Sequence, residues 1–235
     1  MNGFLHDLAA WAPDLWAGTK ITVLLTIASM AVALAFGLVL ALARLAERRV
    51  LAVAATAFVE VIRGSPLLLQ LFYIFYVLPF FGLRLDKFAA GIIGLAVNYG
   101  AYLSEVFRAG IEAVDKGQWE AAGALGLSRP LVLRLVVLPQ AVRIVIPPIG
   151  NYFISLFKDT ALVSTISIPE LIFTGQLIAA DSFKYLQVYS IIFVIYLVIS
   201  YPASLGVRRL ERRLGAGRGG RGGGRGGGGR APGRA

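Results

Sequence analysis

The chain has 235 residues, of which 57% are hydrophobic and 15% are charged, whereas soluble domains average about 45–50% apolar and about 25% charged residues. It contains no cysteine and a single histidine, His6, which excludes disulfide frameworks and thiolate metal sites and leaves almost no residues for Ser-His-Asp catalysis. The net charge is +10, yet the hydrophobic content is too high for a simple nucleic-acid-binding protein. Composition therefore indicates an integral membrane protein of modest size.

Membrane spans are predicted where the sequence is free of charge for long enough. A helix needs about 20 apolar residues to cross a hydrocarbon core of about 30 Å. Four intervals without Asp, Glu, Lys or Arg meet this need: Ile21–Ala43, Gly64–Leu83, Phe88–Ser104 and Tyr185–Val207.

A fifth span is expected from Leu135 to Phe157, although it contains Arg143 and the pair Pro147–Pro148. The stretch Thr160–Ala180 is apolar but interrupted, and we interpret it as a short outer-face hairpin that dips partly into the membrane. The predicted fold class is an all-α integral membrane protein with about five transmembrane helices.

Orientation is predicted from the basic residues, because Lys and Arg concentrate in cytoplasmic loops. With five spans, 18 of the 23 basic residues fall in the connection after the first span, the long third connection and the C-terminus. The other five lie in the opposite set of loops. We therefore expect the N-terminus outside and the C-terminus in the cytoplasm.

The third connection, from about Phe107 to Arg134, is long and does not have the composition of a disordered linker. Asp115 followed by Gln118 predicts a capping box at the start of a short helix. Gly126 is suited to the left-handed residue that ends a helix, and Pro130 begins a new segment.

Trp119, Ala122 and Leu125 are predicted to form one apolar stripe of this helix, with Glu120 on a different face. Two interpretations stay open on periodicity alone. The helix lies on the inner leaflet, or it docks on a cytoplasmic partner with Trp119 as an aromatic anchor.

These residues carry a family resemblance. Glu120-Ala121-Ala122, followed by Gly126 and then Leu138-Pro139, resembles the EAA motif of bacterial ABC-importer permeases. The segment EAAGALGLSRPLVLRLVVLPQAVRIVIPPIGNYFISLFKDTALVS resembles the branch that serves histidine, arginine, glutamine and glutamate uptake. Two further segments resemble the same branch. One is VIRGSPLLLQLFYIFY at the second span, and the other is AYLSEVFRAGIEAVDKGQ at the end of the third span. The resemblance covers about Thr19 to Arg209.

The resemblance implies a type I ABC importer transmembrane domain over 19–210, after an extracytoplasmic N-terminus over 1–18. The loop that couples such permeases to a separate ATPase would here comprise Trp119, Glu120, Ala121, Ala122, Gly126, Leu138 and Pro139. The chain has no phosphate-binding G-x-x-x-x-G-K-[ST] loop. We therefore expect no catalytic residue, metal or cofactor in this chain, and ATP with Mg²⁺ in the partner ATPase.

Further partners follow from topology and from the resemblance. Five helices are too few to enclose an alternating pathway, and no inverted repeat is visible, so a second permease subunit, identical or homologous, is expected. An extracytoplasmic solute-binding protein would deliver an amino-acid substrate near Arg84–Lys87 and Thr174–Lys184. Membrane lipid would surround this multi-pass protein of the bacterial inner membrane.

Polar residues inside spans are costly and mark pathways or buried pairs. Asn98, Tyr102 and Glu105 are predicted to lie on one face of the third span. Thr160 and Ser164 have a similar helical spacing in the segment that follows the predicted span Leu135–Phe157. These five residues are the candidate substrate pathway. Structural alternatives stay open, because Glu105 can pair with Arg108 or Arg63, and Asn98 can bond to a neighbouring helix.

The C-terminal segment over 211–235 is rich in glycine and arginine and is predicted to be disordered. RNA binding, attraction to anionic lipid and a dispensable extension are its three interpretations. Two other functions compete with the importer hypothesis. One is an ion-coupled secondary carrier that works alone, and the other is a membrane anchor with a nucleic-acid-binding tail.

Overall fold

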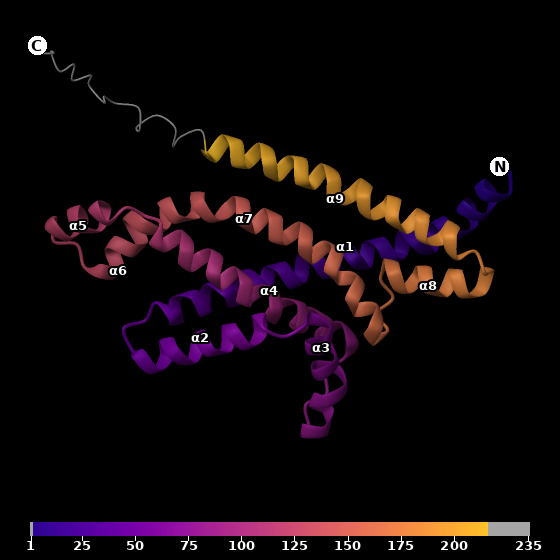
Figure 1. Cartoon of the computed structure of the whole chain (residues 1–235), viewed down its shortest axis with the longest axis horizontal. Helices are drawn as coiled ribbons and strands as arrows, with labels where there is room; N and C mark the ends of the chain where they lie inside the picture. The colour runs from indigo at the N-terminus through magenta and orange to yellow at the C-terminus, as the bar shows by residue number, and fades with distance from the viewer. Residues whose placement is uncertain (1, 216–235) are drawn as a thin grey trace, which may run out of the picture.

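The computed structural model describes residues 2–215, with side chains from 6 to 214, and this part of the chain is helical without strands (Figure 1). Its long helices are α1 (Asn2–Arg44), α4 (Lys87–Glu112), α7 (Leu138–Asp159) and α9 (Tyr185–Gly215). The shorter elements are α2 (Arg49–Arg63), α3 (Leu67–Phe72), η1 (Tyr73–Val77), η2 (Leu78–Phe81), α5 (Lys116–Ala124), α6 (Arg129–Val132), η3 (Leu133–Val137), η4 (Thr160–Ile166) and α8 (Leu171–Ser182).

Within the described residues, four helical segments are long and apolar enough to cross a membrane: His6–Arg44, Lys87–Glu112, Arg129–Ile166 and Tyr185–Leu214. The pair Arg49–Arg63 and Leu67–Phe81 qualifies together as a fifth, with a bend of 104° between its halves. These segments confirm a fold of four to five spans.

The predicted second span, Gly64–Leu83, contains only the second half, Leu67–Phe81, of the bent pair. The first half is α2, which contains Arg49, Glu60 and Arg63 and therefore holds no long charge-free interval. The break falls at the Gly-Ser-Pro sequence over 64–66, where proline disfavours a helical residue before it. After the break, α3 leaves at the steep angle visible in Figure 1.

Helices α1 and α4 form the central pair. They approach so closely that a Cβ built on Gly37 would lie 2.8 Å from the Gly100 carbonyl oxygen, and a Cβ on Gly100 would lie 2.7 Å from the Phe36 ring. Small residues permit such contact between membrane helices, where van der Waals packing replaces the hydrophobic effect. Helices α2, α3, α7 and α8 pack against this α1–α4 pair.

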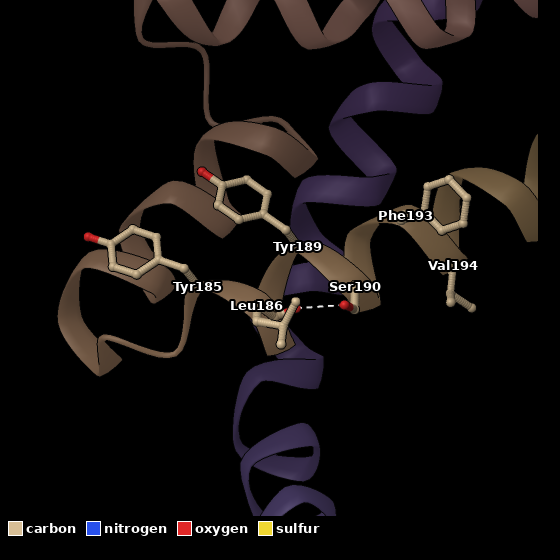
Figure 2. Close-up of a pocket in the computed structure, with 6 residues that line it drawn as sticks. All are labelled: Tyr185, Leu186, Tyr189, Ser190, Phe193 and Val194. Atoms are coloured by element: carbon tan, nitrogen blue, oxygen red, sulfur yellow. Dashed lines mark hydrogen bonds between the residues drawn. The ribbon is translucent and has the colours of Figure 1, made fainter.

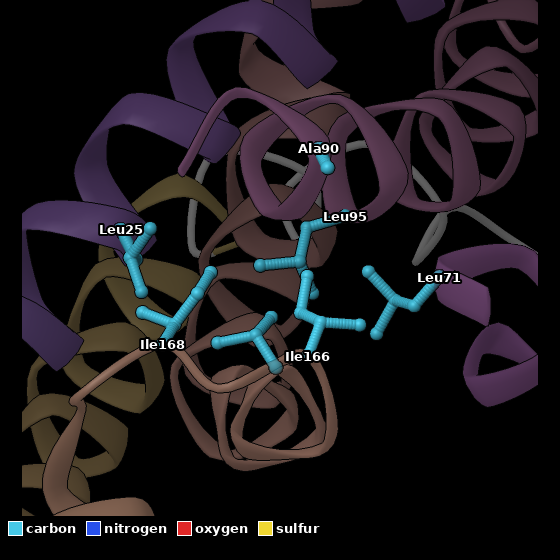
Figure 3. Close-up of a cluster of buried hydrophobic side chains, with 7 residues drawn as sticks. Leu25, Leu71, Ala90, Leu95, Ile166 and Ile168 are labelled. Atoms are coloured by element: carbon cyan, nitrogen blue, oxygen red, sulfur yellow. The ribbon is translucent and has the colours of Figure 1, made fainter. Parts of the chain in front are cut away.

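The main core lies where α1, α3, α4 and η4 meet (Figure 3). Leu25, Leu71 and Leu95 contribute from three helices, and Ile166 and Ile168 come from the end of η4 and the turn after it. All five are almost fully buried. The expected outer-face hairpin over 160–180 is thus two short helices, η4 and α8, and η4 belongs to the core.

Helix α9 lies at the edge of the bundle and leaves one face uncovered by the described chain. Figure 2 shows Tyr185, Tyr189 and Phe193 along this face, together with Leu186 and Val194. The Ser190 hydroxyl donates to the Leu186 carbonyl at 2.6 Å. Because the hydroxyl is hydrogen-bonded within its own helix, placing it in an apolar environment costs little free energy. This face is suited to contact with acyl chains.

Several of the loops and chain ends lie toward two ends of the molecule. In Figure 1 the turn after α1, helix α5 and the C-terminal end of α9 lie toward one end, and the N-terminus and the α8–α9 turn lie toward the other. This grouping matches the two sets of loops used to predict orientation. Helix α9 continues to Gly215, five residues into the segment predicted to be disordered, and 216–235 lie outside the described residues.

Candidate functional site

Helix α5 has a defined cap at each end. At its start the Asp115 carboxylate accepts a hydrogen bond at 2.7 Å from the amide two residues later. At its end Gly126 has a φ of 76°. The Gly126 amide donates to the Gly123 carbonyl at 2.9 Å, and the Leu127 amide donates to the Ala122 carbonyl at 3.3 Å. These two bonds form a Schellman motif, so the predicted end at Gly126 is confirmed.

The helix presents two different faces. Ala122 is 4% exposed, and with the half-buried Trp119 it packs into a cluster with the residues Ile111, Val114, Val132, Val137 and Ala141. Glu120 and Ala121 are exposed on the other side. The prediction that Leu125 extends the apolar stripe is wrong: Leu125 is 81% exposed, because six residues turn a helix by about 600° and bring it some 120° away from Trp119.

A side-chain contact ties α5 to the start of α7. The Gln140 side-chain amide nitrogen donates to the side-chain oxygen Oε1 of Gln118 at 3.3 Å. Gln118 therefore links two helices instead of completing the predicted capping box. Leu138 and Pro139 occupy the first turn of α7, with Leu138 half-buried and Pro139 exposed. This contact joins α5 to a long membrane helix.

At the same end of α4, Glu105 binds three arginines. Its carboxylate accepts hydrogen bonds from Arg44 at 2.8 Å, from Arg63 at 3.0 Å and from Arg108 at 2.9 Å. The Arg44 side chain is 6% exposed and also donates to the Ser104 hydroxyl at 3.2 Å. Both pairings foreseen for Glu105 exist together, and Arg44 adds a third. The cluster joins the ends of α1, α2 and α4.

Next to this cluster lies a strip of tyrosines. The Arg63 guanidinium lies 5.5 Å from the centre of the Tyr102 ring, in cation–π geometry. The centre of the Tyr102 ring is 5.8 Å from that of Tyr152, which in turn is 6.2 Å from that of Tyr99. The Tyr99 hydroxyl donates to the Asp159 carboxylate at 2.6 Å. The strip thus connects a cationic end at Arg63 with an anionic end at Asp159.

The other predicted pathway residues are buried and internally bonded. The Asn98 side chain donates to Gln70 at 3.1 Å, and Gln70 in turn donates across the α2–α3 bend to the Ile62 carbonyl at 2.7 Å. Thr160 and Ser164 donate to backbone carbonyls three residues earlier, each at 2.7 Å. Their placement indicates that they hold the bend and η4 in position, and their role in a pathway stays a prediction.

Several residues of the site carry little signal in the sequence. Tyr152 has no charge to mark it, and Asp159 follows Lys158 at the end of a span, where the two resemble a surface pair. Glu170 is wholly buried, accepts from the Phe173 amide at 2.8 Å and caps α8. Glutamate is not one of the preferred N-cap residues, so the sequence gives little indication of this role.

The class of protein follows from comparison with known sequences. Residues 16–216 match the family described as "Binding-protein-dependent transport system inner membrane component". The chain belongs to this family. It is therefore a multi-pass inner-membrane permease subunit of an ABC importer, and not an enzyme.

Individual relatives refine this class. The chain is 43% identical over 203 residues to the L-cystine transport system permease protein TcyB of Bacillus subtilis, with 86% of this chain and 87% of the relative covered. It is 40% identical over 204 residues to the glutamine transport system permease protein GlnP of Escherichia coli, with 86% and 93% covered.

The fold is also found among solved structures. A crystal structure of an amino acid ABC transporter with histidines superposes with a TM-score of 0.84 at 37% identity, covering 89% of this chain and 98% of that chain. Inward-facing MetNI methionine ABC transporter superposes with a TM-score of 0.72 at 19% identity, covering 86% and 96%, which shows the shared fold alone.

Proposed function

We propose that this permease imports polar amino acids, driven by a separate ATPase that grips helix α5. The observation that carries the proposal is the construction of α5. It is a capped helix whose exposed side offers Glu120 and Ala121, and whose buried side is packed on the membrane helices. The relatives named above transport cystine and glutamine, which supports an amino-acid substrate.

The partners follow from the same arrangement. ATP and Mg²⁺ would bind in the ATPase, since this chain has no phosphate loop. An extracytoplasmic binding protein would deliver the substrate, as the family name indicates. A second permease subunit, either this chain or a homologue, would complete the pathway, because four or five spans in one chain leave no room for an enclosed channel.

The tyrosine strip supports a zwitterionic substrate. An amino acid has an ammonium and a carboxylate, and a site in a low-dielectric setting must offer a charge partner for each. Asp159 is half-buried, and only one of its oxygens is engaged by Tyr99. Arg63 lies at the opposite end over Tyr102, where it also donates to Glu105 at 3.0 Å. We infer that the face with Tyr102, Tyr152 and Asp159 lines the pathway.

The test is reconstitution of the chain with its ATPase and binding protein in proteoliposomes. ATP hydrolysis and uptake are measured across a panel of acidic, basic and neutral polar amino acids. The proposal predicts that at least one of them stimulates hydrolysis and accumulates in an ATP-dependent way. Uptake by the chain alone in an ion gradient without ATP would instead establish a secondary carrier.

A further inference from the structure

A cavity of about 680 Å³ lies beside α5, and the residues that line it do not include the exposed Glu120 and Ala121. Its walls come from the end of α1, the end of α4, α5 and α6. The apolar part of the lining is Leu42, Leu45, Ile111, Val114, Trp119, Pro130 and Leu133. This volume falls within the range of about 300–1,000 Å³ that is typical of small-molecule sites.

The lining is polar at one end only. Leu42 belongs to the charge-free run of α1, whereas Glu47 and Arg129 lie beyond the end of that run. The hydrocarbon core of a bilayer is about 30 Å thick, and the headgroup layers bring it to about 40–45 Å. The cavity therefore extends from acyl-chain depth at Leu42 into the headgroup layer, which is the shape of an amphiphile.

The charges at the polar end are unevenly paired. Arg129 and Glu47 bind each other at 2.6 Å, and Glu112 is bound by Arg108 at 2.7 Å. Lys116 has no ion pair within residues 6–214 and is exposed. The one charge left over is thus positive, which is complementary to a phosphate.

We propose that this cavity binds a membrane glycerophospholipid from the leaflet on the α5 side. Its phosphate contacts the Lys116 ammonium, and one acyl chain lies over Leu42 and Leu45. Because Trp119 lines both the cavity and the buried face of α5, a bound lipid supports the helix from the membrane side. The face with Ala121 and Leu125 stays free for a protein partner.

The test measures lipid binding directly and does not depend on transport. Full-length protein, with any subunits that co-purify, is delipidated and titrated with dioleoyl phosphatidylglycerol, and native mass spectrometry counts the bound molecules. The tightest site should be lost in L45W, which fills the cavity. It should weaken about fivefold in K116Q, because one basic residue at a membrane surface contributes about 1 kcal/mol.

The matched control is L24W, which places the same side chain at an exposed position of α1 far from the cavity. It should bind as the wild type does. Equal binding in L45W and wild type would overturn the proposal, as would equal losses in L45W and L24W. A photo-crosslinker at Leu45 in native membranes gives a second measurement: phospholipid adducts are expected, and adducts with polypeptide alone would show that a protein segment occupies the cavity.

Discussion

Replacing Gly126 by valine should uncouple ATP hydrolysis from transport without disturbing the packing. A Cβ at Gly126 would meet no atom within 4 Å, so the change introduces no clash. The cost is in the backbone alone, because Gly126 has a φ of 76° and a left-handed residue other than glycine costs roughly 1–2 kcal/mol. The β-branch of valine places it at the upper end of that range.

A cost of that size changes an equilibrium by about 5- to 30-fold. The ratio of open to closed Schellman bonds at Gly126 and Leu127 would rise by that factor. α5 would then no longer move as one body with α7, and ATP would be hydrolysed without delivering substrate. We expect the number of substrates transported per ATP to fall several-fold, while the ATPase subunit still co-purifies.

The matched control is Gly123→Ala. Gly123 also has open space around its Cβ position but lies within α5 without a left-handed φ. Alanine there should keep or slightly improve the helix, by about 0.5–1 kcal/mol. The assay is ATP hydrolysis and uptake measured on the same proteoliposomes. An unchanged ratio in G126V, or an equal loss in G123A, would refute the reasoning.

Three further predictions concern the polar cluster, the tyrosine strip and the tail. Glu105→Gln leaves the buried Arg44 and the half-buried Arg63 and Arg108 without their shared carboxylate. Because the cluster is partly exposed, we expect a loss of about 1–3 kcal/mol, which a thermal-shift assay should detect. Glu60→Gln, at an exposed contact of 3.5 Å, should have little effect, and equal stability of the two variants would remove Glu105 as the link between α1, α2 and α4. Asp159→Asn should lower uptake by tenfold or more at normal expression, and Tyr99→Phe should lower it less; wild-type uptake in D159N would eliminate Asp159 as a substrate partner. Ending the chain after Leu214 should leave uptake intact at equal expression, and a large loss would show that the tail has a function in transport.

Much of the fold could be predicted because a bilayer imposes one length and one composition on every span. The charge-free runs inside α1, α4 and α9 are long enough to identify these helices directly. Helix α2 could not be recognised in this way, because its charged residues interrupt the apolar run. In the structure Glu60 and Arg63 lie in the helix and form ion pairs there, so they do not mark a loop. The position of η4 in the core could not be predicted, because it depends on contacts with Leu25 and other residues far away in the sequence.

The site shows the same division between local and distant information. The caps of α5 depend on Asp115 and Gly126, which are local features. The sequence predicts both of these residues correctly, although the capping box with Gln118 does not form. The Glu105 cluster depends on Arg44, which is 61 residues away, and no spacing rule relates the two. The pairing of Tyr99 with Asp159 is likewise set by the packing of α4 against α7. The sequence thus predicts where α5 begins and ends better than it predicts what surrounds the pathway.

Site-specific photo-crosslinking from Ala121 in native membranes tests the coupling role of α5 most directly. Ala121 is on the exposed face, and its neighbour Ala122 is 4% exposed and packed against the membrane helices. A crosslinker at Ala121 should capture an ATPase subunit in high yield, and one at Ala122 should give only adducts within the chain. Capture of phospholipid alone from Ala121 would contradict the account, because α5 would then lie on the membrane surface with no ATPase bound to it.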